Sequence, residues 1–250
     1  MGMLSADQAR DFSENGYLLA PGFLDSAYCA HVAQAITNEY NQLVESGWKF
    51  CAGGRYTGHL NFKSGRYGRE IFEMLQQSGL IAAAEAIMGS RLDLFNMGGN
   101  MNLPGSVRQD IHQDFAPPSE SFVFNVSLVP ARSENGATEI VPLSHGARYT
   151  YRTLHSTAAI QQCRPIESNP GDLTMRFGTL WHRGMPNRSE QPRPMLCFTM
   201  VPTDKKEPTV PDGDPVRFYA NRFYGPQAAV RELAEIHLAK AFHVLRMARS

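Results

Sequence analysis

Short apolar runs separated by Gly, Pro and Asn fill the chain from about residue 90 to 203, and they constrain the fold more than any other feature. Each run has the length of a strand and ends at residues that favour turns, which is typical of a β-sandwich or barrel. The runs are RLDLFNMGGNMNLPGS, SFVFNVSLVPA, TEIVPLSHG, GDLTMRFGTLWHRG and PMLCFTMVP. We therefore expect a mainly β fold with its barrel core over about residues 90–203.

Helical periodicity is expected near the two ends of the chain. Residues 5–47 hold two helical segments, of which the first ends at Gly16 and the second at Gly47. The segment over about residues 226–248 returns to helical periodicity. We expect these helices to flank the barrel and pack on its outside.

Composition excludes several classes of partner. The 250 residues are 42% hydrophobic, and Lys plus Arg and Asp plus Glu both total 24, so no net charge attracts nucleic acid or an anionic membrane. The four cysteines form no C-x-x-C pair, which fits reduced thiols in the cytoplasm. Neither a signal-peptide core nor a membrane-spanning apolar run is present. The sequence thus predicts one cytoplasmic domain over residues 1–250 that uses neither nucleic acid nor a membrane.

A possible metal site begins at His112 and Asp114 in the stretch DIHQD. Residues i and i+2 of a strand point to the same side, so these two could bind one ion together. Fe(II) enzymes that activate oxygen add a second imidazole, for which His182 is the candidate after an apolar strand. Arg193 follows across a turn, where a guanidinium could bind a dicarboxylate through two parallel hydrogen bonds. The His-x-Asp pair alone could be a surface accident, whereas the four residues together are far more specific.

Four longer segments extend this pattern over most of residues 11–200: DFSENGYLLAPGFLD, NLPGSVRQDIHQD, NVSLVPARSENGATEIVPLSHG and GDLTMRFGTLWHRGMPNRSEQPR. They resemble the phytanoyl-CoA dioxygenase-like branch of the Fe(II)/2-oxoglutarate-dependent oxygenases. The matches are an opening helix and strand, Pro-Gly-Ser before His-x-Asp, a segment that usually ends in Pro-Gly-Ser-His, and a distal His before Asn-x-Ser and Arg. Leu143 departs from the family, which usually has Gly there, and we expect it to alter a turn without removing chemistry.

The resemblance implies a double-stranded β-helix, the jelly-roll barrel also found in cupins, with Fe(II) as metal and 2-oxoglutarate and O2 as co-substrates. It implies three metal ligands: His112, Asp114 and His182. Arg193 would bind the distal carboxylate of 2-oxoglutarate, and Gln109 and Thr138 would touch the co-substrate. No catalytic side chain beyond the metal ligands is implied. The implied reaction is oxidation of a C–H bond in a small molecule of specialised metabolism, most simply hydroxylation, with release of succinate and CO2.

Asp114 also separates two chemistries within the family. Halogenating relatives carry a small residue at the carboxylate position, so its presence here favours oxygenation. Desaturation, ring formation and endoperoxide insertion stay open beside hydroxylation.

Three further alternatives are left open by the residues. A metal-binding cupin-type barrel could act as an isomerase or binding protein without oxygen chemistry, but it would have no reason for Arg193. His59 and Asn61 could contact the substrate or lie in a solvated loop, and Phe115 could line the cavity or only pack. The amphipathic C-terminal helix could cover its own barrel or that of a second copy in a homodimer.

Overall fold

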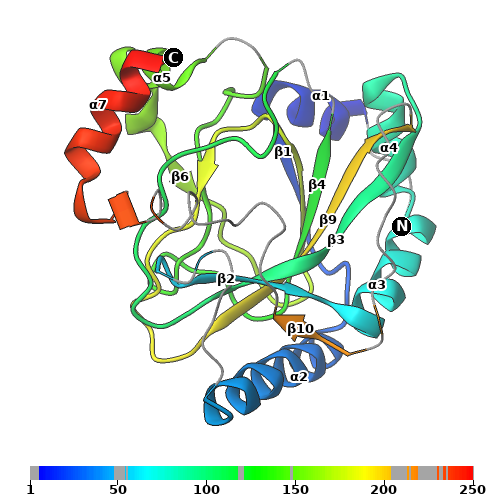
Figure 1. Cartoon of the computed structure of the whole chain (residues 1–250). Helices are drawn as coiled ribbons and strands as arrows, with labels where there is room; N and C mark the ends of the chain where they lie inside the picture. The colour runs from blue at the N-terminus through cyan, green and yellow to red at the C-terminus, as the bar shows by residue number, and fades with distance from the viewer. Residues whose placement is uncertain are drawn as a thin grey trace.

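Two antiparallel sheets form the centre of the protein, as the computed structural model in Figure 1 shows. The structure describes residues 6–47, 54, 56–117, 121–146, 149–203, 213, 215–218, 230, 233–234 and 236–249. The larger sheet has seven strands, in the order β1 (Tyr17–Ala20), β7 (Leu173–Phe177), β4 (Phe122–Ser127), β9 (Arg193–Pro202), β3 (Leu92–Asn102), β2 (His59–Lys63) and β10 (Arg217–Phe218). The smaller sheet has three, in the order β6 (Arg164–Pro165), β5 (Glu139–Ile140) and β8 (His182–Arg183). The predicted mainly β architecture is confirmed.

The larger sheet extends beyond the predicted core of residues 90–203. β1 forms one edge of the sheet, and β10, with β2 beside it, forms the other. These three strands hold two to five residues each. β1 pairs with β7, and β2 pairs with β3. Runs this short carry too little alternation to be recognised on their own, and only β1 was expected, through the family resemblance. Because β1 pairs with β7 and β2 pairs with β3, the backbone N–H and C=O groups of β7 and β3 are not left as exposed sheet edges.

Helices lie around the larger sheet on the side away from the barrel interior (Figure 1). They are α1 (Ala6–Asn15), α2 (Ser26–Glu45), α3 (Gly65–Gln77) and α4 (Leu80–Met88), the last two not placed by the sequence. Ile36 and Ile71 from these helices share one buried cluster with Phe124, Leu196 and Phe198 of the sheet. No helix in the described part of the chain is long and apolar enough to cross a membrane.

Two further helices, α5 (Tyr151–Ser156) and α7 (Ala239–Arg249), lie on the opposite side of the barrel (Figure 1), and the short helix η1 (Ala159–Gln162) contacts α5. The helix predicted over about residues 226–248 overlaps α7, whereas residues 226–229, 231, 232 and 235 lie outside the described residues. α5 and α7 pack against each other. Helices near both termini therefore do flank the barrel, as expected.

Polar side chains cover the inner face of the larger sheet. Register aligns Asn125 of β4 with Thr174 of β7 and with Cys197 of β9. Arg176 and Arg193 face the same side, because residues two apart on a strand share a face. The alternation therefore gives the sheet an apolar face toward the helices and a polar face toward the barrel interior.

Leu143, the departure from the family pattern, has a left-handed backbone with φ 62° and is 47% exposed. A side chain in this region costs about 1–2 kcal/mol, of which the greater entropy of unfolded glycine would offset about half. We therefore expect Leu143→Gly to raise the melting temperature by about 2 °C in calorimetry. Leu143→Ala keeps the Cβ atom and should give no such gain. Equal gains for both variants would show that loss of an exposed leucine, not backbone strain, is the cause.

Candidate metal centre

A backbone bridge joins the two candidate histidines. The amide of His112 donates to the carbonyl of His182 at 2.9 Å, and the amide of His182 donates back at 2.9 Å. On its other side His182 pairs with Ile140 of β5. The imidazole rings consequently lie with centroids 4.5 Å apart. The pairing of two distant segments therefore places both imidazoles side by side.

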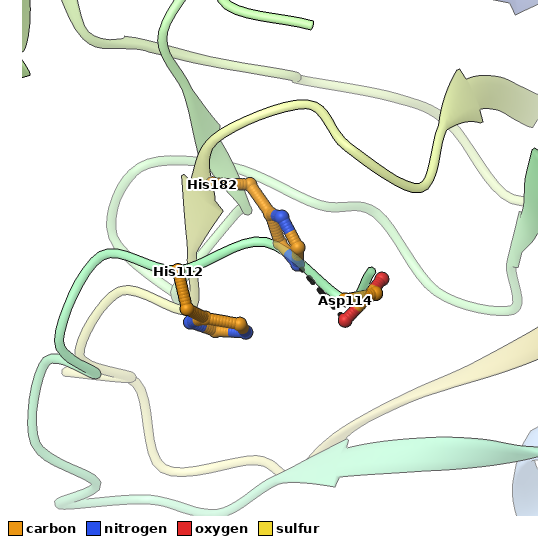
Figure 2. Close-up of side chains that lie close together, drawn as sticks. All are labelled: His112, Asp114 and His182. Carbon is orange, nitrogen blue, oxygen red and sulfur yellow. Dashed lines mark ion pairs between the residues drawn. The ribbon is translucent and has the colours of Figure 1, made fainter. Parts of the chain in front are cut away.

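Asp114 completes the group from the same loop as His112. Its amide and that of Phe115 both donate to the carbonyl of Gly178, at 3.0 and 3.1 Å. Oδ1 of Asp114 lies 3.6 Å from Nε2 of His182, and the possible ligand atoms of all three residues lie within 4.8 Å of one another. Figure 2 shows the three side chains converging on one space. Two imidazoles and a carboxylate on one side of an ion are the ligand set of non-haem Fe(II) oxygenases.

The hydrogen bonds of both imidazoles fit metal binding. Nδ1 of His112 bonds to the carbonyl of Asp110 at 2.8 Å, and Nδ1 of His182 bonds to that of Leu180 at 2.9 Å. A carbonyl can only accept, so each Nδ1 carries the proton and each Nε2 keeps its lone pair. Such outer contacts orient metal-binding histidines. The donor set therefore fits a divalent metal.

Charges around the site favour the protonation states that a metal needs. Desolvation alone would raise the pKa of Asp114, but Arg176 and then the two imidazoles outweigh it and hold the pKa well below its usual range. Nη2 of Arg176 lies 2.5 Å from Oδ2 of Asp114. Burial, followed by the charge of Arg176, lowers the pKa of His182 to about 3. The carboxylate is thus ionised and the imidazole neutral near neutral pH.

Sequence reasoning did not identify Arg176. It is 5% exposed on β7 and contacts Asp114, which lies far from it in the chain. The only signal was a charged residue inside the apolar run LTMRF. Because a buried guanidinium is costly without a partner, that position could have been marked as functional.

A cavity lies on the polar inner face of the sheet. Seven of its lining residues offer polar groups: Asn125, Ser127, Thr138, Ser168, Thr174, Arg176 and Arg193. Arg176 therefore borders both the cavity and the possible metal ligand Asp114. The cavity and the candidate metal centre are connected through this one side chain.

Arg193 is buried in this cavity at 4% exposure. Its Nε and Nη2 donate to the carbonyls of Asn135 and Gly136 at 3.2 and 2.9 Å. Among the residues that the structure describes, no carboxylate pairs with it. Burial lowers its pKa to about 10, so it stays charged near neutral pH. A buried cation without an anion is costly, and the cavity therefore suits an anionic ligand.

Thr138 and Arg193 are brought together in the cavity, whereas Gln109 is not among its lining residues. Oε1 of Gln109 accepts from the amide of Gly184 at 2.8 Å, two residues after His182. A Cβ atom on Gly184 would lie 2.6 Å from that oxygen and 2.6 Å from Cε1 of His59. Gln109 is thus placed to hold the strand of the distal histidine, and its contact with a co-substrate stays a prediction.

The three expected substrate contacts lie in different surroundings. His59 is 2% exposed, and its Nε2 bonds to the carbonyl of Val107 at 2.8 Å. Asn61 accepts from Nδ2 of Asn100 at 3.3 Å on the inner face of the sheet. The ring of Phe115 meets that of Phe95 edge-on, with centroids 5.9 Å apart. His59 is therefore placed to brace the loop before His112, while the other two are partly exposed.

Comparison with known proteins gives one family and one fold. The family model "Phytanoyl-CoA dioxygenase (PhyH)" matches residues 12–195. Dioxygenase trt7 of Aspergillus terreus is 30% identical over 111 residues, which are 40% of this chain and only 37% of that protein. Dioxygenase andF of Emericella variicolor is 27% identical over 211 residues, covering 75% of this chain and 70% of that one.

Solved structures share the fold at low identity. EvdO2 from Micromonospora carbonacea var. aurantiaca, complexed with 2-oxoglutarate, superposes with a TM-score of 0.62 at 15% identity over 88% of this chain and 95% of that one. This likeness confirms the predicted double-stranded β-helix.

Proposed function

Since this chain belongs to the phytanoyl-CoA dioxygenase family, we propose that it is an Fe(II)- and 2-oxoglutarate-dependent dioxygenase. In this proposal it oxidises a C–H bond of a small molecule, most simply by hydroxylation, and releases succinate and CO2. A cytoplasmic location and a role in specialised metabolism belong to the same proposal.

One observation supports the proposal: three residues of the facial ligand type converge near a cavity with a buried arginine that has no carboxylate partner among the described residues. Arg176 connects the two, because it contacts Asp114 and lines the cavity. A metal-only isomerase or binding protein would need the ligands, but it would gain nothing from Arg193. A keto acid that chelates the metal and carries a second carboxylate would use both parts.

Each side chain has a defined part in this proposal. His112, Asp114 and His182 would hold Fe(II), which with 2-oxoglutarate supplies the oxidising power when bound. Arg193 would bind the distal carboxylate through its guanidinium, and the Thr138 hydroxyl would donate a further hydrogen bond. Arg176 keeps Asp114 ionised and fixes one of its oxygens, which leaves the other free for the metal.

The protein surroundings would position the substrate and limit access of water. We propose Asn61 and Phe115 as substrate contacts, since both are partly exposed. Positioning of the target carbon beside the metal is the main task that remains for the protein.

Anaerobic titration of the metal-free protein tests the proposal directly. Addition of Fe(II) and then 2-oxoglutarate should produce a weak visible charge-transfer band, because the keto acid chelates the metal through its carboxylate and carbonyl. The same titration with Zn(II), which has a filled d shell, should give no band. Iron binding without a band would exclude keto-acid chelation and favour the metal-only barrel.

A further inference from the structure

The C-terminal helix α7 reaches the loop that carries two of the three possible metal ligands. Nη1 of Arg246 forms an ion pair with Oδ2 of Asp110. The same nitrogen donates to the carbonyl of Ile111 at 3.0 Å. Asp110 and Ile111 directly precede His112. One side chain of α7 therefore holds the backbone just before the first ligand.

Asp110 transmits this contact to the imidazole. Its carbonyl oxygen accepts from Nδ1 of His112 at 2.8 Å, the bond that leaves Nε2 of that ring available to a metal. A shift of the Asp110 backbone would therefore rotate the His112 ring or change its tautomer. The position of Asp110 is consequently part of the metal-site geometry, although its carboxylate is not a ligand in our assignment.

The carboxylate of Asp110 is held from two helices. Oδ1 accepts from the hydroxyl of Tyr151 on α5 at 3.2 Å. The Tyr151 hydroxyl also bonds to Nδ1 of His243 on α7 at 3.0 Å. The guanidinium of Arg246 lies over the Tyr151 ring, 3.9 Å from its centroid, which adds a cation–π contact. These bonds join α5, α7 and the His112 loop into one network.

Both candidate metal-binding histidines directly follow residues of one apolar cluster. We call it the Trp181 cluster. Its buried members are Ile111, Val141, Tyr151, Leu154, Ala159 and Trp181. Ile111 precedes His112, and Trp181 precedes His182. Met247 of α7 packs against this cluster beside Arg246. The same helix therefore supports the segments of both histidines.

We propose that Arg246 is a positioning residue of the metal centre, which sets the orientation of His112 by holding Asp110 and the carbonyl of Ile111. The inference rests on the proposed function, because it assigns a role toward the metal of that same site. Loss of an outer contact to a metal ligand typically lowers metal affinity about 10–100-fold. Arg246 acts through one intervening residue, so an effect of about tenfold is expected.

The test is metal binding by an Arg246→Gln variant, with Fe(II) under anaerobic conditions and with Co(II). We expect the dissociation constant of each metal to rise about tenfold. The visible d–d bands of the Co(II) protein should also shift, because they depend on the geometry of the ligands. Arg246→Lys keeps the charge without the planar fork and should lie between wild type and Arg246→Gln.

Lys240→Gln is the matched control, since Lys240 is an exposed cation on the same helix. It should leave both metal affinities and the Co(II) spectrum unchanged. If Arg246→Gln only lowers the melting temperature, with wild-type affinity and spectrum, α7 is a stabilising element and the proposal is overturned.

Asp110→Asn provides a second route if Arg246→Gln does not fold. Asp110→Asn should also raise the metal dissociation constant. If the pair acts as a unit, the double variant should bind metal no more weakly than the single variant with the larger loss of affinity. Additive effects would overturn the coupling of Arg246 to His112 through Asp110. Absence of metal binding in the wild type would instead contradict the proposed function itself.

Discussion

Asp114→Ala is expected to lose Fe(II) binding at micromolar metal and to melt at a lower temperature than the wild type. The substitution removes one of three ligands, so metal loss follows from the ligand count. It also leaves the Arg176 guanidinium, whose side chain is 6% exposed, without its carboxylate. An uncompensated buried charge costs about 2–3 kcal/mol, which corresponds to about 5 °C or more in a chain of this length. Iron analysis of the purified protein and calorimetry measure the two effects.

A double variant separates these two effects. Asp114→Ala with Arg176→Met removes both charges of the pair, so most of the lost melting temperature should return. Metal binding should stay absent, because the ligand is still missing. Wild-type iron content in the single variant would contradict the ligand assignment. If the double variant is no more stable than Asp114→Ala, the unpaired charge of Arg176 is not the cause of the lowered melting temperature.

Arg193→Ala is expected to raise the dissociation constant for 2-oxoglutarate at least 100-fold while that for Fe(II) changes little. Arg193 is buried in the cavity without a carboxylate partner among the described residues, so the ligand would supply its counter-charge. A desolvated two-pronged contact contributes about 3 kcal/mol, equivalent to about 100-fold in affinity. Titration of the visible charge-transfer band under anaerobic conditions measures the change.

Arg193→Lys is the control, because lysine keeps the charge but not the planar fork of the guanidinium. Its affinity for 2-oxoglutarate should lie between those of the wild type and Arg193→Ala. The melting temperature of the ligand-free Arg193→Ala protein should fall less than truncation of a large buried side chain usually implies, because a costly buried cation is removed as well. Equal loss of Fe(II) and 2-oxoglutarate binding would count against the role of Arg193 as the co-substrate anchor.

Local spacing in the sequence predicted the fold class and the principal candidate residues of the site. Apolar runs of five to eleven residues with turn residues around them are enough to recognise strands such as β3, β4 and β7, because both signals are local in the chain. His112 and Asp114 could be paired because they are two residues apart on an extended segment. His182 and Arg193 could be named as candidates from the usual ligand set and from the turn between them, and the resemblance of longer segments to a known family then supported joining them to this pair.

Local spacing could not predict the edge strands or the contacts that Arg176 and Arg246 make with the metal-site loop. β2 and β10 were missed, and β1 was expected only through the family resemblance, because a short strand has meaning only beside its partner. Arg176 contacts a residue 62 positions away, and Arg246 contacts one 136 positions away. Nothing in a single sequence relates such positions, since neither periodicity nor a motif extends that far.

The sequence by itself determined the class of fold and predicted the three possible ligands and the arginine suited to a dicarboxylate, because side-chain chemistry and spacing within a segment are local properties. Tertiary structure alone decided that His112 and His182 exchange backbone hydrogen bonds, that Arg176 borders both metal centre and cavity, and that α7 supports the His112 loop. The physical reason is that these contacts arise from strand pairing and packing between distant segments, whose register is fixed only when the whole barrel forms.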